Sequence, residues 1–132
     1  MTRIFEDAYY TADTHPQDAR VEVTRSSAPF AEMQSLLQAA DQLIHAIDEA
    51  KASGYTLLLD SRAAPVAPEG KYRDAFFMVT RNLTARFHRV AVILKSAETI
   101  ENAKKKARAE VDFFCSLEEA REHLNKFAHE TK

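Results

Sequence analysis

The chain has 132 residues, of which 45% are hydrophobic and 29% are charged, the composition of one globular domain and not of a disordered segment. Its 18 basic and 20 acidic residues give a net charge of −2, so no overall positive field exists to hold nucleic acid or an anionic membrane. Its two glycines are too few for the dinucleotide-binding fingerprint, and the chain lacks the phosphate loop of nucleotide hydrolases.

Features that indicate export or membrane insertion are missing from the sequence. The lone Cys115 cannot form an intrachain disulfide, and residues 1–10 lack the apolar run of a signal peptide. No segment approaches the ~18 consecutive apolar residues of a membrane span. We therefore expect a cytoplasmic protein without membrane insertion.

The N-terminal region is rich in β-prone residues. Residues 4–11 and 20–24 form two short segments of this kind, and turn-forming residues at 13–18 separate them. This pattern predicts an antiparallel hairpin.

A helix and a central strand follow the hairpin. Apolar residues recur at helical spacing from Met33 to Ile47, and Gly54 comes where a left-handed helix cap is favoured. Residues 55–60 then contain three consecutive leucines without alternation, which predicts a strand covered on both faces.

The same alternation continues to the end of the chain. After a loop at 63–70, the pattern predicts a helix from Tyr72 to Leu83 and a buried strand at 87–94. Ser96 is placed to cap an exposed third helix that extends to about Ala109.

The last strand and helix complete the pattern. Residues 111–115 read as a strand, and Ser116 and Glu119 have the spacing of a capping box that opens the closing helix. The order is ββαβαβαβα, which predicts a single α/β domain over residues 1–132. We expect a mostly parallel mixed sheet of about five strands, with helices on its faces and the antiparallel hairpin at one edge.

Three segments carry a family resemblance: Leu57–Ser61 ends one strand, Arg89–Ile93 lies in the next, and Phe113–Ala120 leads into the closing helix. In this order they resemble the STAS-like superfamily of sulfate-transporter cytoplasmic domains, anti-sigma-factor antagonists and CRAL-TRIO-like bacterial relatives. The resemblance implies a regulatory, non-catalytic domain.

The antagonists of that superfamily are phosphorylated at a Ser or Thr in an Asp-Ser-Ser-Gly-like context after the central strand. Here Asp60, Ser61 and Arg62 are followed by Ala63, without a second hydroxyl or a glycine before Gly70. The chain therefore departs from the phosphorylation motif and resembles the broader branch of the superfamily.

The carboxyl ends of parallel strands are the usual ligand-binding edge of such sheets. Asp60, Ser61, Arg62, Lys95 and Ser96 follow two of the predicted strands, which makes them a candidate anion site. In the alternative reading, Ser96 is only a helix cap and Asp60 only binds loop amides.

Catalytic and metal sites have less support. Cys115 shares the strand parity of Phe113, so we expect it to be buried and not a nucleophile activated by His88 or His123. The five histidines show no metal-ligand spacing, and there is no second cysteine. We expect no metal and no cofactor.

Charge and aromatic residues are unevenly distributed. Residues 1–50 carry three basic and nine acidic side chains, a balance of −6, whereas residues 62–108 carry eleven basic and four acidic ones, a balance of +7. The lysine run at 104–106 is typical of a solvated helix face. The adjacent aromatic pairs exceed what one core needs, so we expect them to form a dimer interface of Tyr9, Tyr10, Phe76 and Phe77.

The sequence supports two alternative functions of different classes. The first is a non-enzymatic, homodimeric regulatory domain that acts through protein contacts, with the second helix and the loop after Asp60 as its recognition surface. The alternative is a carrier of a small apolar or lipid-like ligand, whose anionic headgroup lies at the strand carboxyl ends. A ligand-sized cavity at that edge separates the two.

Overall fold

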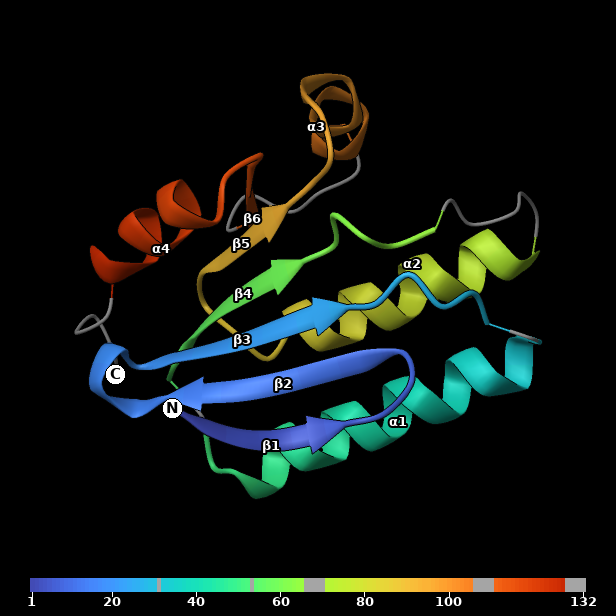
Figure 1. Cartoon of the computed structure of the whole chain (residues 1–132), viewed down its shortest axis with the longest axis horizontal. Helices are drawn as coiled ribbons and strands as arrows, with labels where there is room; N and C mark the ends of the chain where they lie inside the picture. Colours follow the sequence, from blue (N-terminus) through green and yellow to red (C-terminus); the bar gives the residue numbers. More distant parts are fainter. Residues whose placement is uncertain (31, 53, 66–70, 106–110, 128–132) are drawn as a thin grey trace.

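The fold is a single twisted sheet with helices on both faces (Figure 1). The computed structural model describes residues 1–30, 32–52, 54–65, 71–105 and 111–127, and of residues 71–73, 76 and 102 it describes the backbone alone. The strands are β1 (Thr2–Glu6), β2 (Tyr10–His15), β3 (Arg20–Arg25), β4 (Thr56–Asp60), β5 (Val90–Ile93) and β6 (Val111–Phe114). The helices are α1 (Met33–Glu49), α2 (Lys71–Thr84), α3 (Ala97–Lys104) and α4 (Leu117–Asn125), and a 3-10 helix, η1 (Pro16–Asp18), joins β2 to β3.

The six strands lie in the sheet in the same order as in the chain. β1, β2 and β3 pair antiparallel, whereas β3, β4, β5 and β6 pair parallel. The predicted α/β class, with antiparallel N-terminal strands and a parallel remainder, is confirmed. The prediction that the leucine run of β4 and the apolar run of β5 are neighbouring interior strands is also confirmed.

The N-terminal region has three strands where the sequence predicted two. Residues 4–11 are not one strand, because the chain reverses after Glu6. The Asp7 carboxylate accepts hydrogen bonds from the backbone N–H of Tyr9 (2.8 Å) and of Tyr10 (2.7 Å), which stabilises a tight turn. Of the residues expected to form the turn, 13–15 complete β2, and only Pro16–Asp18 make the connection to β3, so the sheet has six strands and not about five.

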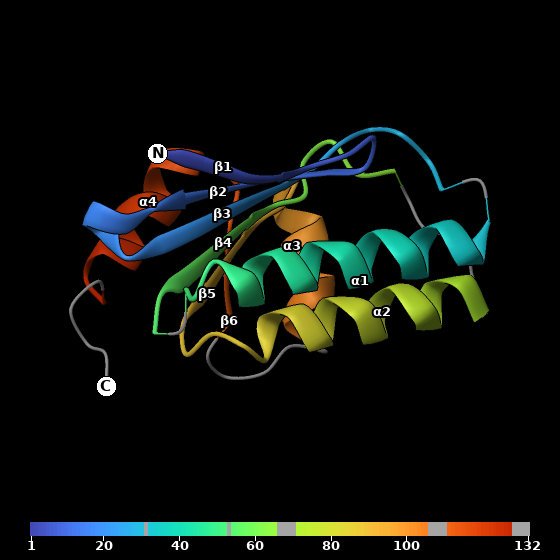
Figure 2. The same ribbon diagram turned by 90° about the horizontal axis from the view of Figure 1, so that it is seen from below.

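The helices divide between the two faces of the sheet. α1 and α2 run in the same direction side by side on one face, and α4 lies on the other (Figure 2). Right-handed crossovers between strands added in one direction place their helices on the same face. α4 follows the last strand, so it has no further strand to reach and packs back over β4 and β5.

Each face of the sheet has its own apolar core. Leu57 and Leu59 of β4 point toward α1 and α2, whereas Leu58 packs with Ala120 and Leu124 of α4. The three leucines are at most 5% exposed, as the prediction of a strand covered on both faces requires.

The helix ends follow local chemistry. Ser96 and Ser116 accept hydrogen bonds from the N–H groups of Thr99 and Glu119, so both predicted N-caps are confirmed. The left-handed residue after α1 is Lys51 (φ 55°), while Gly54 (φ 89°) serves the turn that enters β4. The expected continuation of α3 to Ala109 and most of the 63–70 loop lie outside the described residues.

None of the helices in the described part of the chain is long and apolar enough to cross a membrane.

Candidate functional site

The predicted site residues meet at the carboxyl ends of β4 and β5. Asp60 is in register with Ile93, and the Ser61 N–H donates to the Ile93 carbonyl at 2.9 Å. Lys95 and Ser96 follow β5 after Leu94, and both are exposed. The parallel register therefore brings the two predicted segments to one edge of the sheet.

Asp60 and Arg62 bind each other. Arg62 Nε lies 3.0 Å from Asp60 Oδ1 and Nη2 lies 2.7 Å from Oδ2, a bidentate pair, and the Arg62 N–H also donates to Oδ1. Partial burial raises the pKa of the Asp60 carboxyl, but the hydrogen bonds from Arg62 outweigh this effect and lower it below its ordinary value. The Arg62 charge that was expected to hold an anion is thus already balanced within the chain.

The Ser96 hydroxyl is also engaged within the chain, as the N-cap of α3. Its Oγ accepts from the Thr99 N–H at 3.3 Å and lies 2.9 Å from Thr99 Oγ1. The capping interpretation of Ser96 is confirmed. Lys95 is left as an exposed positive charge at this edge.

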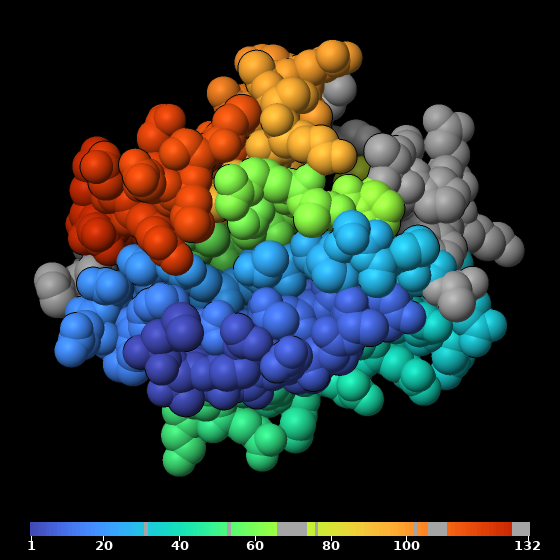
Figure 3. All heavy atoms as spheres, viewed as in Figure 1, coloured from blue at the N-terminus to red at the C-terminus, as the bar shows by residue number. Residues whose placement is uncertain are grey.

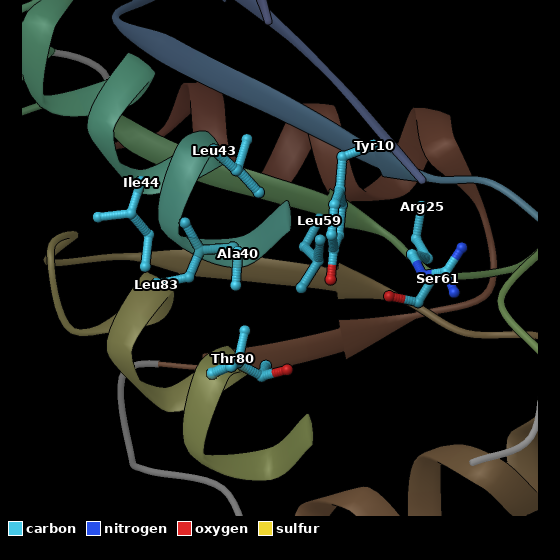
Figure 4. Close-up of a pocket in the computed structure, with 10 residues that line it drawn as sticks. Tyr10, Arg25, Ala40, Leu43, Ile44, Leu59, Ser61, Thr80 and Leu83 are labelled. Carbon is cyan, nitrogen blue, oxygen red and sulfur yellow. The ribbon is translucent and has the colours of Figure 1, made fainter. Parts of the chain in front are cut away.

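Ser61 points into a small cavity beneath the edge (Figure 4). The cavity has a volume of about 20 Å³, room for about one water molecule. Its walls are mostly apolar and come from β2, β3, β4, α1 and α2. They comprise Tyr10, Arg25, Ala40, Leu43, Ile44, Leu59, Ser61, Val79, Thr80 and Leu83.

Arg25 is the residue of this region that the sequence reasoning missed. It is only 3% exposed, and its guanidinium lies 4.4 Å from the Phe30 ring centroid and close to the rings of Tyr9 and Tyr10. Its Nη1 donates to the Ser26 carbonyl at 2.6 Å. The sequence could have indicated it, because side chains alternate along a strand. Val21, Val23 and Arg25 are two residues apart and therefore point to the same inward face.

Two of the four residues expected at a dimer interface are used inside the chain. Tyr10 is 6% exposed, and its burial raises the pKa of its hydroxyl, an effect that Arg25 opposes. Tyr9 is half-buried and stacks on Phe30 with ring centroids 4.3 Å apart. Phe77 is 39% exposed on α2, and the side chain of Phe76 lies outside the described part of the structure.

A charged cluster joins α4 to β3 on the other face of the sheet. Figure 3 shows α4, in orange and red, beside the blue surface of β1, β2 and β3. The buried Glu22 accepts from Arg20 Nε at 2.7 Å, from Arg121 Nε at 2.9 Å and from Arg121 Nη2 at 2.8 Å. Arg20 Nη1 also donates to Asn125 Oδ1 at 3.0 Å. His15 Nε2 lies 3.6 Å from Glu22 Oε1. This cluster ties the closing helix to the sheet.

The prediction that Cys115 is buried is wrong. Cys115 is exposed because it lies just beyond the last residue of β6, where it packs against neither apolar core. His123 Nε2 lies 2.9 Å from Asp112 Oδ2, and its ring packs against Phe114 and Phe127. No histidine of the described ranges is hydrogen-bonded to Cys115. The same ranges hold no group of three or more metal-ligating side chains.

A second hollow lies on the outer side of α1 and shares Ile44 with the small cavity. It is an open, polar groove of about 380 Å³, in which Arg86 pairs with Asp48 at 3.0 Å. Its lining residues are Asp41, Gln42, Ile44, His45, Asp48 and Arg86.

No protein-family model, curated protein or solved structure matches this chain significantly.

Proposed function

We propose that the protein is a non-enzymatic, STAS-like regulatory domain that acts as a homodimer and recognises a further protein through the outer seam between α1 and α2. We define this α1–α2 seam by Leu37, Phe77 and Met78. The observation that carries the proposal is their exposure. Apart from Met1, they are the exposed large apolar side chains of the described chain, at 41%, 39% and 53%.

Leu37 and Phe77 lie along one region of the helix pair, and Met78 follows Phe77 about 100° further around the exposed side of α2. Leu37 comes two turns before Ile44 on the same side of α1, and Phe77 comes one turn before Thr80 on α2. Ile44 and Thr80 meet at the walls of the small cavity, and the two helices run in the same direction (Figure 2). Leu37 and Phe77 therefore lie toward the same end of the seam.

The size of the interior cavity disfavours the carrier alternative. Sites for small organic ligands usually have volumes of about 300–1,000 Å³. The cavity at the strand carboxyl ends has about 20 Å³. The positive charge expected beside a bound headgroup is also reduced there, because Arg62 pairs with Asp60. A protein surface needs no such cavity.

The proposal is tested by photo-crosslinking in the cells that produce the protein. A photoreactive amino acid replaces Met78, and the matched control carries it at Glu118, an exposed residue of α4 on the opposite face. We expect the Met78 position to form a crosslink to one defined protein and the Glu118 position to form none with that protein. Equal crosslinking of many proteins from both positions would contradict the proposal.

A second variant tests the apolar character of the contact. Leu37→Ser removes apolar surface from the α1–α2 seam at a position that is already 41% exposed, so the fold should persist. The crosslink from position 78 should fall several-fold in this background, with an unchanged circular dichroism spectrum. An undiminished crosslink would show that the seam does not bind the partner.

A further inference from the structure

We infer that the open edge of β6 binds β6 of a second copy, so that the sheet continues across a two-fold dimer. This inference rests on the proposed function, because it supplies the surface of the homodimer. The β6 edge is a different surface from the α1–α2 seam. It binds a second copy of this chain, whereas the seam binds another protein.

The sheet has two edge strands, and they differ in how they are protected. β1 carries a register shift between Arg3 and Phe5 and the charges of Arg3 and Glu6, and Arg3 also pairs with Asp13 of β2. A register shift and charged side chains discourage pairing with another strand. β6 reads Val-Asp-Phe-Phe, keeps an unbroken register with β5 and carries one charge. Among the described residues no strand pairs with its other edge.

The hydrogen-bond pattern shows which backbone groups face outward. The Leu94 N–H donates to the Phe114 carbonyl at 2.8 Å, so the backbone groups of Phe114 point toward β5. Backbone direction alternates along a strand. The N–H and C=O groups of Val111 and Phe113 therefore point away from the sheet, toward the open edge.

Symmetry and charge together favour a register centred on Phe113 over one centred on Asp112. A two-fold axis that continues a sheet with antiparallel strands lies perpendicular to it and pairs one residue with its own copy. An axis at Asp112 would place two carboxylates opposite each other, which is unfavourable. An axis at Phe113 lets both Phe113 residues exchange N–H···O=C bonds, because their backbone groups face outward. Val111 then lies opposite Cys115 of the second copy.

The side chains suit this register. Val111 and Phe113 are half-buried and pack in part against the core on the α1 and α2 face. Pairing sets the two Phe113 rings side by side on that face and covers apolar area that one copy leaves open. Because a single short strand pair is a small contact, we expect a dimer whose population rises with concentration.

The register is tested with Val111→Cys, which uses the native Cys115. Within one chain Val111 begins β6 and Cys115 follows its last residue, so the two positions are too far apart for a disulfide. In the proposed dimer their Cα atoms lie about 5.5 Å apart, within disulfide range. We expect mild oxidation to give a covalent dimer with a 111–115 bond identified by peptide mass spectrometry. The controls are Asp112→Cys, which faces the other side of the sheet, and the unmodified chain.

A second pair of variants tests the hydrogen bonds. Cys115→Pro removes one N–H that would donate to the Val111 carbonyl of the second copy, whereas Cys115→Ala keeps this N–H. The Cys115 side chain is exposed, so its loss should change the stability of neither variant much. In sedimentation equilibrium we expect the Ala variant to dimerise like the unmodified chain and the Pro variant to do so about tenfold more weakly, since two hydrogen bonds are lost by symmetry.

Two results would overturn the β6 dimer. One is an unmodified chain that stays monomeric to its solubility limit. The other is a dimer that the Pro variant does not weaken and in which no 111–115 bond forms. The first result would also remove the homodimer from the proposed function, whereas the second would leave a dimer that forms through another surface. Neither result changes the crosslinks from position 78, so failure at β6 is distinguishable from failure of the proposed partner recognition.

Discussion

Arg121 of α4 and Glu22 of β3, which are 99 residues apart in the chain, form a bidentate pair with N···O distances of 2.8 and 2.9 Å. Glu22 is 8% exposed, and Arg20 binds the same carboxylate. The pair fixes where the last helix lies on a sheet face that α4 covers only in part. Apolar contacts of α4 alone, through Ala120 and Leu124, would restrain its rotation about its axis less strongly.

The Glu22 cluster makes stability depend on acid pH. Burial raises the pKa of Glu22, but hydrogen bonds from Arg121 and Arg20 outweigh it and lower the pKa below its ordinary value of 4.5. A carboxyl with a lowered folded-state pKa stabilises the fold above its ordinary pKa, and this stabilisation is lost as the pH falls through the folded value. We predict that Glu22→Gln lowers the free energy of unfolding by about 3 kcal/mol at pH 7, because the buried Arg20 charge then lacks its negative partner.

The measurement is urea unfolding at neutral pH and at a pH below the folded pKa of Glu22. The two proteins should differ much less in acid, where the native carboxyl is also protonated. Asp60→Asn is the matched control. Its partner Arg62 has a side chain that is 42% exposed, so we expect a loss below about 1 kcal/mol. An equal loss for Glu22→Gln at both pH values would show that charge is not the cause.

The two serine caps should differ in their effect on global stability. Ser116 caps α4, which contributes the buried Ala120 and Leu124, so Ser116→Ala should lower the free energy of unfolding by about 1 kcal/mol. Ser96 caps α3, which has no buried residue among those whose side chains are described, and Ser96→Ala should change it by less than about 0.5 kcal/mol. Hydrogen exchange should instead show faster local opening of α3. Similar global losses would contradict this distinction.

Lys51 should be replaceable with a gain in stability. Its backbone is left-handed (φ 55°), a conformation that costs a residue with a Cβ about 1 kcal/mol and costs glycine little. Thermal unfolding of Lys51→Gly should therefore show a gain of about 0.5–1 kcal/mol. Gly54→Ala provides the opposite test, because φ is 89° there, and it should lose about 1 kcal/mol. The account of this turn is wrong if Lys51→Gly is destabilising.

Much of the parallel half could be predicted because single residues or short runs determine it. The leucines of β4 allow only a strand with two covered faces, and the hydroxyls of Ser96 and Ser116 satisfy free helix amides wherever the helices pack. The N-terminal region was harder, because residues 4–11 are β-prone throughout. The break depends on one Asp7 carboxylate that accepts two backbone hydrogen bonds.

The candidate site could be placed but not described from the sequence. Parallel register brings Asp60 and Lys95 to one edge, as expected. Whether Arg62 points at a ligand or at Asp60 depends on side-chain geometry that spacing does not determine. The meeting of Glu22 and Arg121 depends on how α4 docks. Their separation along the chain gives no periodic signal.

The central claim is that the protein acts through its surface and holds no small ligand inside. Native mass spectrometry of the protein purified from its producing cells tests this most directly. We predict the mass of the chain, 14.9 kDa, together with its dimer and complexes with other proteins, and no small molecule bound. A stoichiometric small molecule that stays bound, and whose loss lowers the melting temperature, would contradict the account.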